Sequence, residues 1–137
     1  MSEQYKTAAR NFIEKGLNRK ELSALETYFS PDLIDHALPP GLPSGREGRK
    51  LFASALLAAF PDLQVTVEDM IAEGEKLVVR YSVRGTHKGN LMGIPPTGKE
   101  IFVTGTAIDR FDSGQSVEHW EIIDQLGLMQ QLGVVPA

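Results

Sequence analysis

The segment from Glu118 to Asp124 reads Glu-His-Trp-Glu-Ile-Ile-Asp and concentrates side chains that could do chemistry. Side chains alternate between the two faces of a strand, so a strand here would place Trp120, Ile122 and Asp124 on one face. Burial among apolar neighbours raises the pKa of a carboxyl group toward the range useful for proton transfer. Asp124 is therefore a candidate catalytic acid or base, and Trp120 a candidate pocket residue.

Asp124 has a second interpretation of equal weight, because a segment with helical spacing begins near Gln125. Asp is favoured immediately before a helix, where its carboxylate accepts a hydrogen bond from the first turn. The sequence leaves the choice between proton transfer and helix capping open. His119 falls on the opposite face of the strand, where a histidine is more often a surface or interface residue than a catalyst, and it is a further candidate for the substrate pocket.

Two more polar side chains are candidates for a pocket. His36 follows a short extended piece and precedes a proline-rich loop, so it could form the lip of a pocket and assist catalysis, or simply lie in solvent. Arg80 lies within an apolar run, where a buried guanidinium would need a carboxylate partner. The alternative for Arg80 is a side chain whose stem lies on the sheet and whose head reaches water.

Several other chemistries find no support. The chain has no cysteine, which excludes thiolate nucleophiles, disulfides and Cys-ligated zinc. The histidines His36, His87 and His119 are far apart, with no pair at metal-ligand spacing, so we expect no metal site. Residues 93–99 resemble a phosphate-binding loop, but Glu100 replaces the required hydroxyl residue and two prolines remove backbone donors. We expect no cofactor.

Composition limits the partners. The chain of 137 residues has the length of one domain, 1–137, and its 14 Lys and Arg against 18 Asp and Glu give a net charge of −4. This balance argues against nucleic acid or an anionic membrane surface, both of which select a basic face. We find no apolar run long enough to span a membrane and no leader at the start, and so expect a cytoplasmic protein.

Hydrophobic spacing predicts the elements that must position these side chains. A period near 3.6 predicts helices over about 5–13, 22–29 and 51–60, the second of them capped by Asn18 with Glu21. From Leu63 onward the period changes to two, which predicts four antiparallel strands and then a short closing helix. Helices followed by strands indicate an α+β fold, with the helices on the concave face of the sheet.

The last two predicted strands, 101–108 and 117–123, carry apolar side chains on both faces. The outer face of the sheet should therefore also be covered. The simplest cover is a second copy of the chain, which gives a two-fold homodimer.

Several stretches together resemble the SnoaL-like polyketide cyclases, also called ester cyclases, in their order and spacing. The resemblance runs from about His36 to Gly133. The stretches that carry it are Phe-Pro-Asp-Leu at 60–63, Gly-Thr-His-Lys-Gly at 85–89, Gly-Ile-Pro-Pro-Thr-Gly-Lys at 93–99, His-Trp to Asp at 119–124, and Asp-Gln-Leu-Gly-Leu-Met-Gln-Gln-Leu-Gly at 124–133.

The resemblance implies a nuclear-transport-factor-2-like cone, in which a curved antiparallel sheet packs on the N-terminal helices and encloses an apolar cavity. Family cyclases close a ring by intramolecular aldol condensation without a cofactor, and their catalytic Asp matches Asp124. His36 matches a pocket histidine. A further family histidine, on the strand before the last, has no counterpart here, and Arg110 lies near that point.

The function expected from these residues is that of a cofactor-independent cyclase or isomerase acting on a small apolar carbonyl compound. A domain of this fold could instead bind a small molecule without catalysis, because a fold does not fix a function. The third hypothesis is an epoxide or ester hydrolase that would group Asp124, Arg80 and Asp109 around one water molecule.

Overall fold

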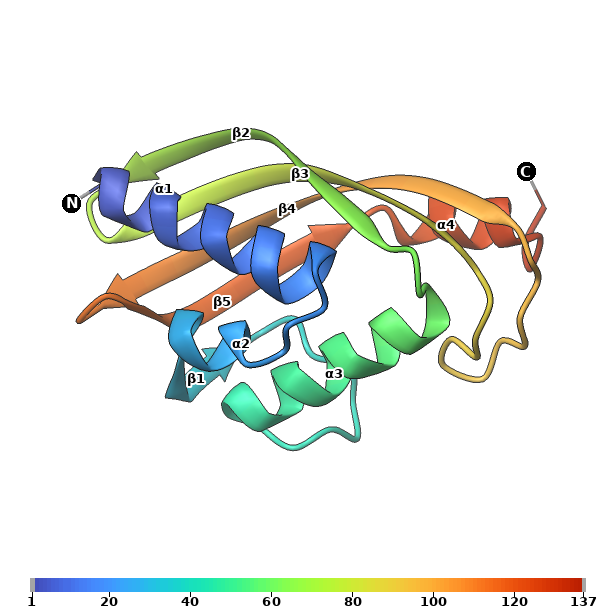
Figure 1. Ribbon diagram of the computed structural model, residues 1–137, viewed down its shortest axis with the longest axis horizontal. Coiled ribbons are helices and arrows are strands. Elements are labelled where there is room, and N and C mark those ends of the chain that lie inside the picture. Colours follow the sequence, from blue (N-terminus) through green and yellow to red (C-terminus); the bar gives the residue numbers. More distant parts are fainter. Residues whose placement is uncertain (1, 137) are drawn as a thin grey trace.

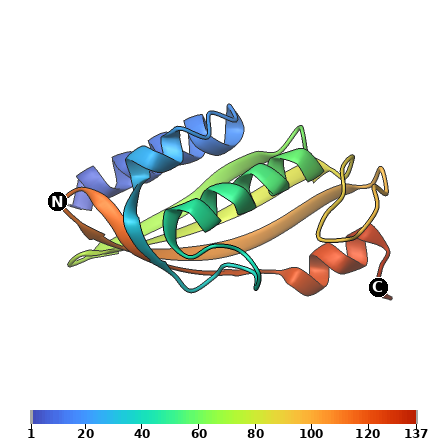
Figure 2. The same ribbon diagram turned by 90° about the horizontal axis from the view of Figure 1, so that it is seen from below.

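The computed structural model describes residues 2–136, which form one curved, open sheet with helices on its concave side (Figure 1; Figure 2). The elements are α1 (Ser2–Asn11), the π-helix η1 (Phe12–Asn18), α2 (Ala24–Tyr28), β1 (Phe29–Asp35), α3 (Gly45–Ala59), β2 (Gln64–Glu73), β3 (Lys76–Thr86), β4 (Glu100–Asp112), β5 (Gln115–Ile123) and α4 (Gln125–Leu132). The α+β class and the change from helices to strands are as expected from the sequence.

The sheet has the strand order β1-β5-β4-β3-β2, and neighbouring strands from β5 to β2 are antiparallel. It therefore has one strand more than the four expected. The extra strand, β1, pairs parallel with β5 at the edge, and the backbone N–H of His36 continues this pairing by donating to the carbonyl of His119.

The first helix does not end near residue 13, because it continues as η1 to Asn18. The expected cap by Asn18 is wrong. Its side-chain amide bonds both backbone groups of Val65 on β2, donating to the carbonyl at 3.0 Å and accepting from the N–H at 2.7 Å. This long-range pairing fixes the N-terminal helices against the edge of the sheet, a role that local spacing cannot reveal.

Side chains that are buried against the helices form the inner face of the sheet, and on β3 and β4 they occupy every second position. Along β4 the odd-numbered residues from Ile101 to Phe111 are buried against the helices, and along β3 the inner side chains are Leu77, Val79, Tyr81 and Val83. The core is thus a layer between this face and the helices α1, α2 and α3, as Figure 2 shows from below.

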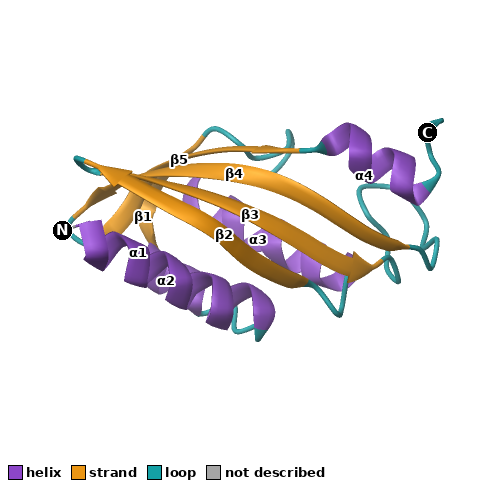
Figure 3. Ribbon diagram, turned by 90° about the horizontal axis from the view of Figure 1, so that it is seen from above, coloured by secondary structure: helices purple, strands orange, loops and turns teal. Residues whose placement is uncertain are grey.

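The helix α4 lies beyond the end of β5 (Figure 3). β5 ends at Ile123, opposite Gly105, so the first residues of β4 have no strand on that side. The side chain of Gln131 replaces the missing strand, because its amide accepts from the N–H of Phe102 at 2.7 Å and donates to the carbonyl at 2.9 Å. Among the described residues, no helix is long and apolar enough to cross a bilayer.

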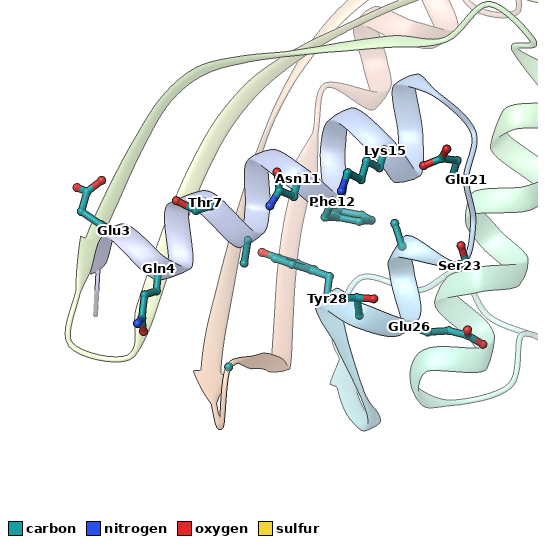
Figure 4. Close-up of a pocket in the computed structure, with 14 residues that line it drawn as sticks. Glu3, Gln4, Thr7, Asn11, Phe12, Lys15, Glu21, Ser23, Glu26 and Tyr28 are labelled. Carbon is teal, nitrogen blue, oxygen red and sulfur yellow. The ribbon is translucent and has the colours of Figure 1, made fainter.

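Two hollows mark the surface. One, of about 900 Å³, lies between α1, η1 and α2 and has Phe12 and Tyr28 among its lining residues (Figure 4). The other, of about 680 Å³, lies on the outer face of the sheet beside Trp120. Neither has lining residues from α3, the helix that covers the chemically richest part of the inner face.

Candidate functional site

The register of β4 and β5 decides which side chains of β5 face the helices. His119 lies opposite Asp109 and Trp120 opposite Ile108, and Asp109 belongs to the buried, inner set of β4. His119 and Glu121 therefore face inward, and Trp120 faces outward. The expected faces of this strand are reversed, because alternation pairs residues by face without saying which face meets the helices.

Asp109 is the innermost carboxylate of the site, with 2% of the residue exposed. Its Oδ1 accepts hydrogen bonds from the Ser116 hydroxyl at 2.7 Å and from Nδ1 of His119 at 2.8 Å. Its Oδ2 accepts from the Tyr28 hydroxyl at 3.1 Å, which reaches in from α2. A buried carboxylate needs such donors to replace its lost water.

Glu121 is the outermost carboxylate of the same cluster, and 25% of its side chain is exposed. One oxygen lies 2.9 Å from Nε2 of His119, and the other accepts a hydrogen bond from the Tyr81 hydroxyl on β3. Gly105 makes this contact possible, since a Cβ there would lie 2.5 Å from the Tyr81 hydroxyl. The glycine of β4 thus lets a side chain from β3 cross the strand to β5.

A buried ion pair forms the third side of the cluster. The Arg49 guanidinium on α3 donates two hydrogen bonds to Asp35 on β1, at 2.7 and 3.0 Å. A guanidinium nitrogen of Arg49 also lies 3.8 Å from Glu121. The helix α3 therefore brings a fixed positive charge to the carboxylate that remains open to solvent.

These contacts set the charges at neutral pH. Burial alone would lower the pKa of His119, but the charge and hydrogen bonds of Asp109 and Glu121 prevail and raise it to about 9. Burial would raise the pKa of Glu121, but the hydrogen bond and charge of His119, together with Arg49 and Tyr81, lower it below its ordinary value. His119 is thus a cation between two carboxylates.

Tyr81 completes the set of donors around Glu121. Burial and the charge of Glu121 raise the pKa of the Tyr81 phenol above its ordinary value, so it remains an O–H donor. The cluster therefore holds one accessible carboxylate base beside three donors, which are the Tyr81 hydroxyl, the His119 ring and the Arg49 guanidinium. This is what proton transfer next to a carbonyl group requires.

The structure places Asp124 outside this cluster. Its residue is exposed, it precedes α4, and its carboxylate accepts a hydrogen bond from the N–H of Gly127 at 2.9 Å. The expected position inside a cavity beside Trp120 is wrong. The capping interpretation describes the geometry, and Gly127 supports it because its missing side chain leaves room for the carboxylate.

Three further candidates also lie outside the cluster. His36 is on the outer face, where its ring stacks on Trp120 at 5.1 Å and its Nε2 is 2.7 Å from Glu118. Arg80 extends from the outer face and bonds Asp69 at 3.0 Å, with 54% of its side chain exposed. Trp120 and Arg80 therefore lie outside the inner cluster, Trp120 beside the hollow of the outer face, and His36 does not form a lip over the inner cluster.

The hydrolase grouping is not assembled either, because Asp109 faces inward while Arg80 faces outward and Asp124 caps α4. The structure does bring His119 into the cluster. Sequence reasoning did not select Glu121, Arg49 or Tyr81. A signal for Glu121 was present, since it shares a strand face with His119. Across residues 2–136, no three His, Asp or Glu side chains are arranged to hold a metal ion.

Comparisons with known proteins agree on a family. A family model described as SnoaL-like polyketide cyclase matches residues 7–132. TsrD from Streptomyces laurentii is 26% identical with a TM-score of 0.90, covering 97% of each chain. IdmH from Streptomyces antibioticus, provisionally described as a polyketide cyclase, is 33% identical with a TM-score of 0.82, over 95% of this chain and 99% of its own.

A different activity is attached to another similar structure. AclR from Streptomyces galilaeus, provisionally described as a hydroxylase, is 33% identical with a TM-score of 0.85, over all of this chain and 85% of its own. Among curated protein sequences, none matches the chain.

Proposed function

The chain belongs to the SnoaL-like polyketide cyclase family, and on that premise we propose that it is a cofactor-independent cyclase or isomerase of a small apolar carbonyl compound, with Glu121 as its proton-transfer group. The observation that carries the proposal is the state of Glu121. It is the carboxylate of the inner cluster that is open to solvent, and His119, Tyr81 and Arg49 keep it ionised.

The proposed reaction balances without an added reactant. Glu121 takes a proton from the carbon next to a substrate carbonyl, and the electron pair of the broken C–H bond forms an enolate. Once Glu121 carries the proton, the Tyr81 hydroxyl no longer has to donate to it, and this hydroxyl and Arg49 stabilise the negative oxygen. The enolate carbon then bonds to a second carbonyl carbon of the same molecule, and Glu121 returns its proton to that carbonyl's oxygen. In an isomerase the proton returns to carbon instead.

The first step can be measured with a probe that need not cyclise. We expect the protein to accelerate exchange of the α-hydrogens of 2-tetralone, a neutral bicyclic ketone, with solvent deuterium, followed by NMR. The rate should be bell-shaped in pH. It should fall in acid as Glu121 is protonated and fall above about 9 as His119 loses its proton.

Two outcomes would contradict this account. A rate that keeps rising through pH 9 would contradict the role given to His119. No acceleration over buffer with 2-tetralone or related neutral ketones would favour the alternative, a domain that binds a small molecule without catalysis.

We also propose that the protein is a homodimer through the outer face of its sheet. Apolar side chains gather on that face, and Ile71, Phe102 and Ile122 are 64%, 50% and 78% exposed. The outer apolar patch consists of Ile71, Val78, Ile108, Trp120 and Ile122. A patch of this kind marks an association site, and a second copy offers a matching patch across a two-fold axis.

Replacing Ile122 by Asp places a charge in the middle of this patch, and we expect it to dissociate the dimer. Light scattering should give twice the 15.0 kDa chain mass for the unmodified protein and a single chain mass for Ile122→Asp. Leu51→Asp is the control, because Leu51 is also an exposed apolar residue, at 50%, but lies on α3 away from this face. A monomer before any substitution, or dissociation by Leu51→Asp, would contradict this interface.

A further inference from the structure

The inner cluster has an anchored end and an open end. At the open end Glu121 is partly exposed, whereas at the other end Asp109 is surrounded by protein. His119 lies between them and bonds each through a different ring nitrogen, Nδ1 to Asp109 at 2.8 Å and Nε2 to Glu121 at 2.9 Å. The charge of one carboxylate therefore affects the pKa of the other through the protonation of the ring.

The hydrogen-bond partners of the His119 ring determine how many protons it carries. An ionised carboxylate can only accept, so both ring nitrogens of His119 must donate to satisfy Asp109 and Glu121. Asp109 is in turn fixed by two hydroxyl donors, Ser116 at 2.7 Å and Tyr28 at 3.1 Å. With these and His119, each oxygen of Asp109 has a donor, which leaves the carboxylate no freedom to rotate away.

We propose that Asp109 is a positioning residue that keeps His119 doubly protonated and thereby keeps Glu121 an ionised base. The effect of Asp109 on His119 can be measured without any substrate. Only its consequence for catalysis, an ionised Glu121, rests on the proposed function. The Tyr28 hydroxyl on α2 modifies the effect of Asp109 on His119. It competes with His119 for Asp109, and its ring is held by stacking on Phe12 at a centroid distance of 4.7 Å.

The charged and titratable groups that contact His119 or its partners come from several elements. Asp109 and Glu121 contact the ring directly, Arg49 of α3 reaches it through Glu121, and Tyr28 of α2 through Asp109. Asp35 of β1 lies opposite His119 in the strand pairing, and its carboxylate is paired with Arg49. Two substitutions in this chain of contacts should have effects of opposite sign.

Asp109→Asn removes the anion but keeps the shape. Without the anion the doubly protonated ring loses its inner partner, and His119 should lose its proton at about pH 7 rather than about 9. A neutral ring no longer offers Glu121 a positive charge, so Glu121 holds its proton to higher pH. The pH range over which α-hydrogen exchange is fast should therefore become narrower at both its acid and its alkaline end.

Tyr28→Phe should shift His119 the other way. Removing the competing hydroxyl leaves Asp109 a stronger acceptor for Nδ1–H, so the ring should hold its proton to a higher pH than in the unmodified protein. If the cluster only stabilised the fold, both substitutions would weaken its contacts and both would lower the pKa of His119. The opposite signs therefore separate a positioning role from a structural one.

The experiment is an NMR titration of the histidine ring signals, assigned with His36→Gln and His87→Gln. The control is Asp112→Asn, an exposed carboxylate at the end of the same strand, which should leave His119 unchanged. An unchanged His119 in Asp109→Asn, or a lowered pKa in Tyr28→Phe, overturns the proposal. If Asp109→Asn does not fold, the sign in Tyr28→Phe decides. If the pKa of His119 shifts as expected but the unmodified protein does not accelerate α-hydrogen exchange, the proposed function is overturned and the positioning role of Asp109 remains.

Discussion

Replacing Glu121 by Gln should lower the rate of α-hydrogen exchange in 2-tetralone by roughly 10²-fold or more, the loss typical of a removed general base. The amide keeps the size of the side chain but cannot take a proton from carbon. One of the two donors now facing Glu121, Tyr81 or His119, would meet an N–H group instead of an oxygen. The exchange rate at pH 7 for the two proteins checks this directly.

The pKa of His119 gives an internal check on the same variant. Glu121 is one of the two anions that raise it, so Glu121→Gln should lower the pKa of His119 from about 9. A variant that exchanges slowly while its His119 still titrates near 9 would show that the substitution disturbed the fold or the ligand contact instead of the base.

Replacing Arg49 by Met should destabilise the protein by about 3–5 kcal/mol, the cost of leaving a buried charge without its partner. The Asp35 side chain is fully buried and takes two hydrogen bonds from Arg49. Its remaining donor is the backbone N–H of Ala37. Urea denaturation followed by circular dichroism measures the loss.

Two variants make that prediction specific. Lys50→Met removes the neighbouring cation of α3, whose pair with Glu26 is exposed to solvent, and should cost far less stability than Arg49→Met. Arg49→Met combined with Asp35→Asn removes both charges and should recover much of the lost stability. Equal losses in Arg49→Met and Lys50→Met would contradict the importance given to the buried pair.

The sequence predicts the elements well because their signals are local. The change of hydrophobic period near Leu63 corresponds to the start of the antiparallel strands at β2. Strand β1 was recognised only as an extended piece, because a parallel edge strand forms through a distant partner, β5. The side-chain pairing of Asn18 with Val65 is likewise invisible to local spacing.

The candidate site is harder to predict because it depends on which face of β5 turns inward. Burying Trp120 in the core was the natural assumption, yet the indole is covered on the outer face by His36 on one side and Lys76 at 5.3 Å. One wrong assumption about a bulky residue reverses every other side chain of the strand. It turned His119 outward and Asp124 inward, and it hid the pairing of His119 with Asp109.

The most direct test of the account compares two isosteric substitutions three positions apart in the sequence. Glu121→Gln and Asp124→Asn each convert a carboxylate into an amide, one in the inner cluster and one at the cap of α4. Asn caps a helix nearly as well as Asp, so Asp124→Asn should retain the α-hydrogen exchange rate, whereas Glu121→Gln should lose roughly 10²-fold or more. The reverse pattern, with exchange lost in Asp124→Asn and kept in Glu121→Gln, would contradict the assignment of Glu121 as the base.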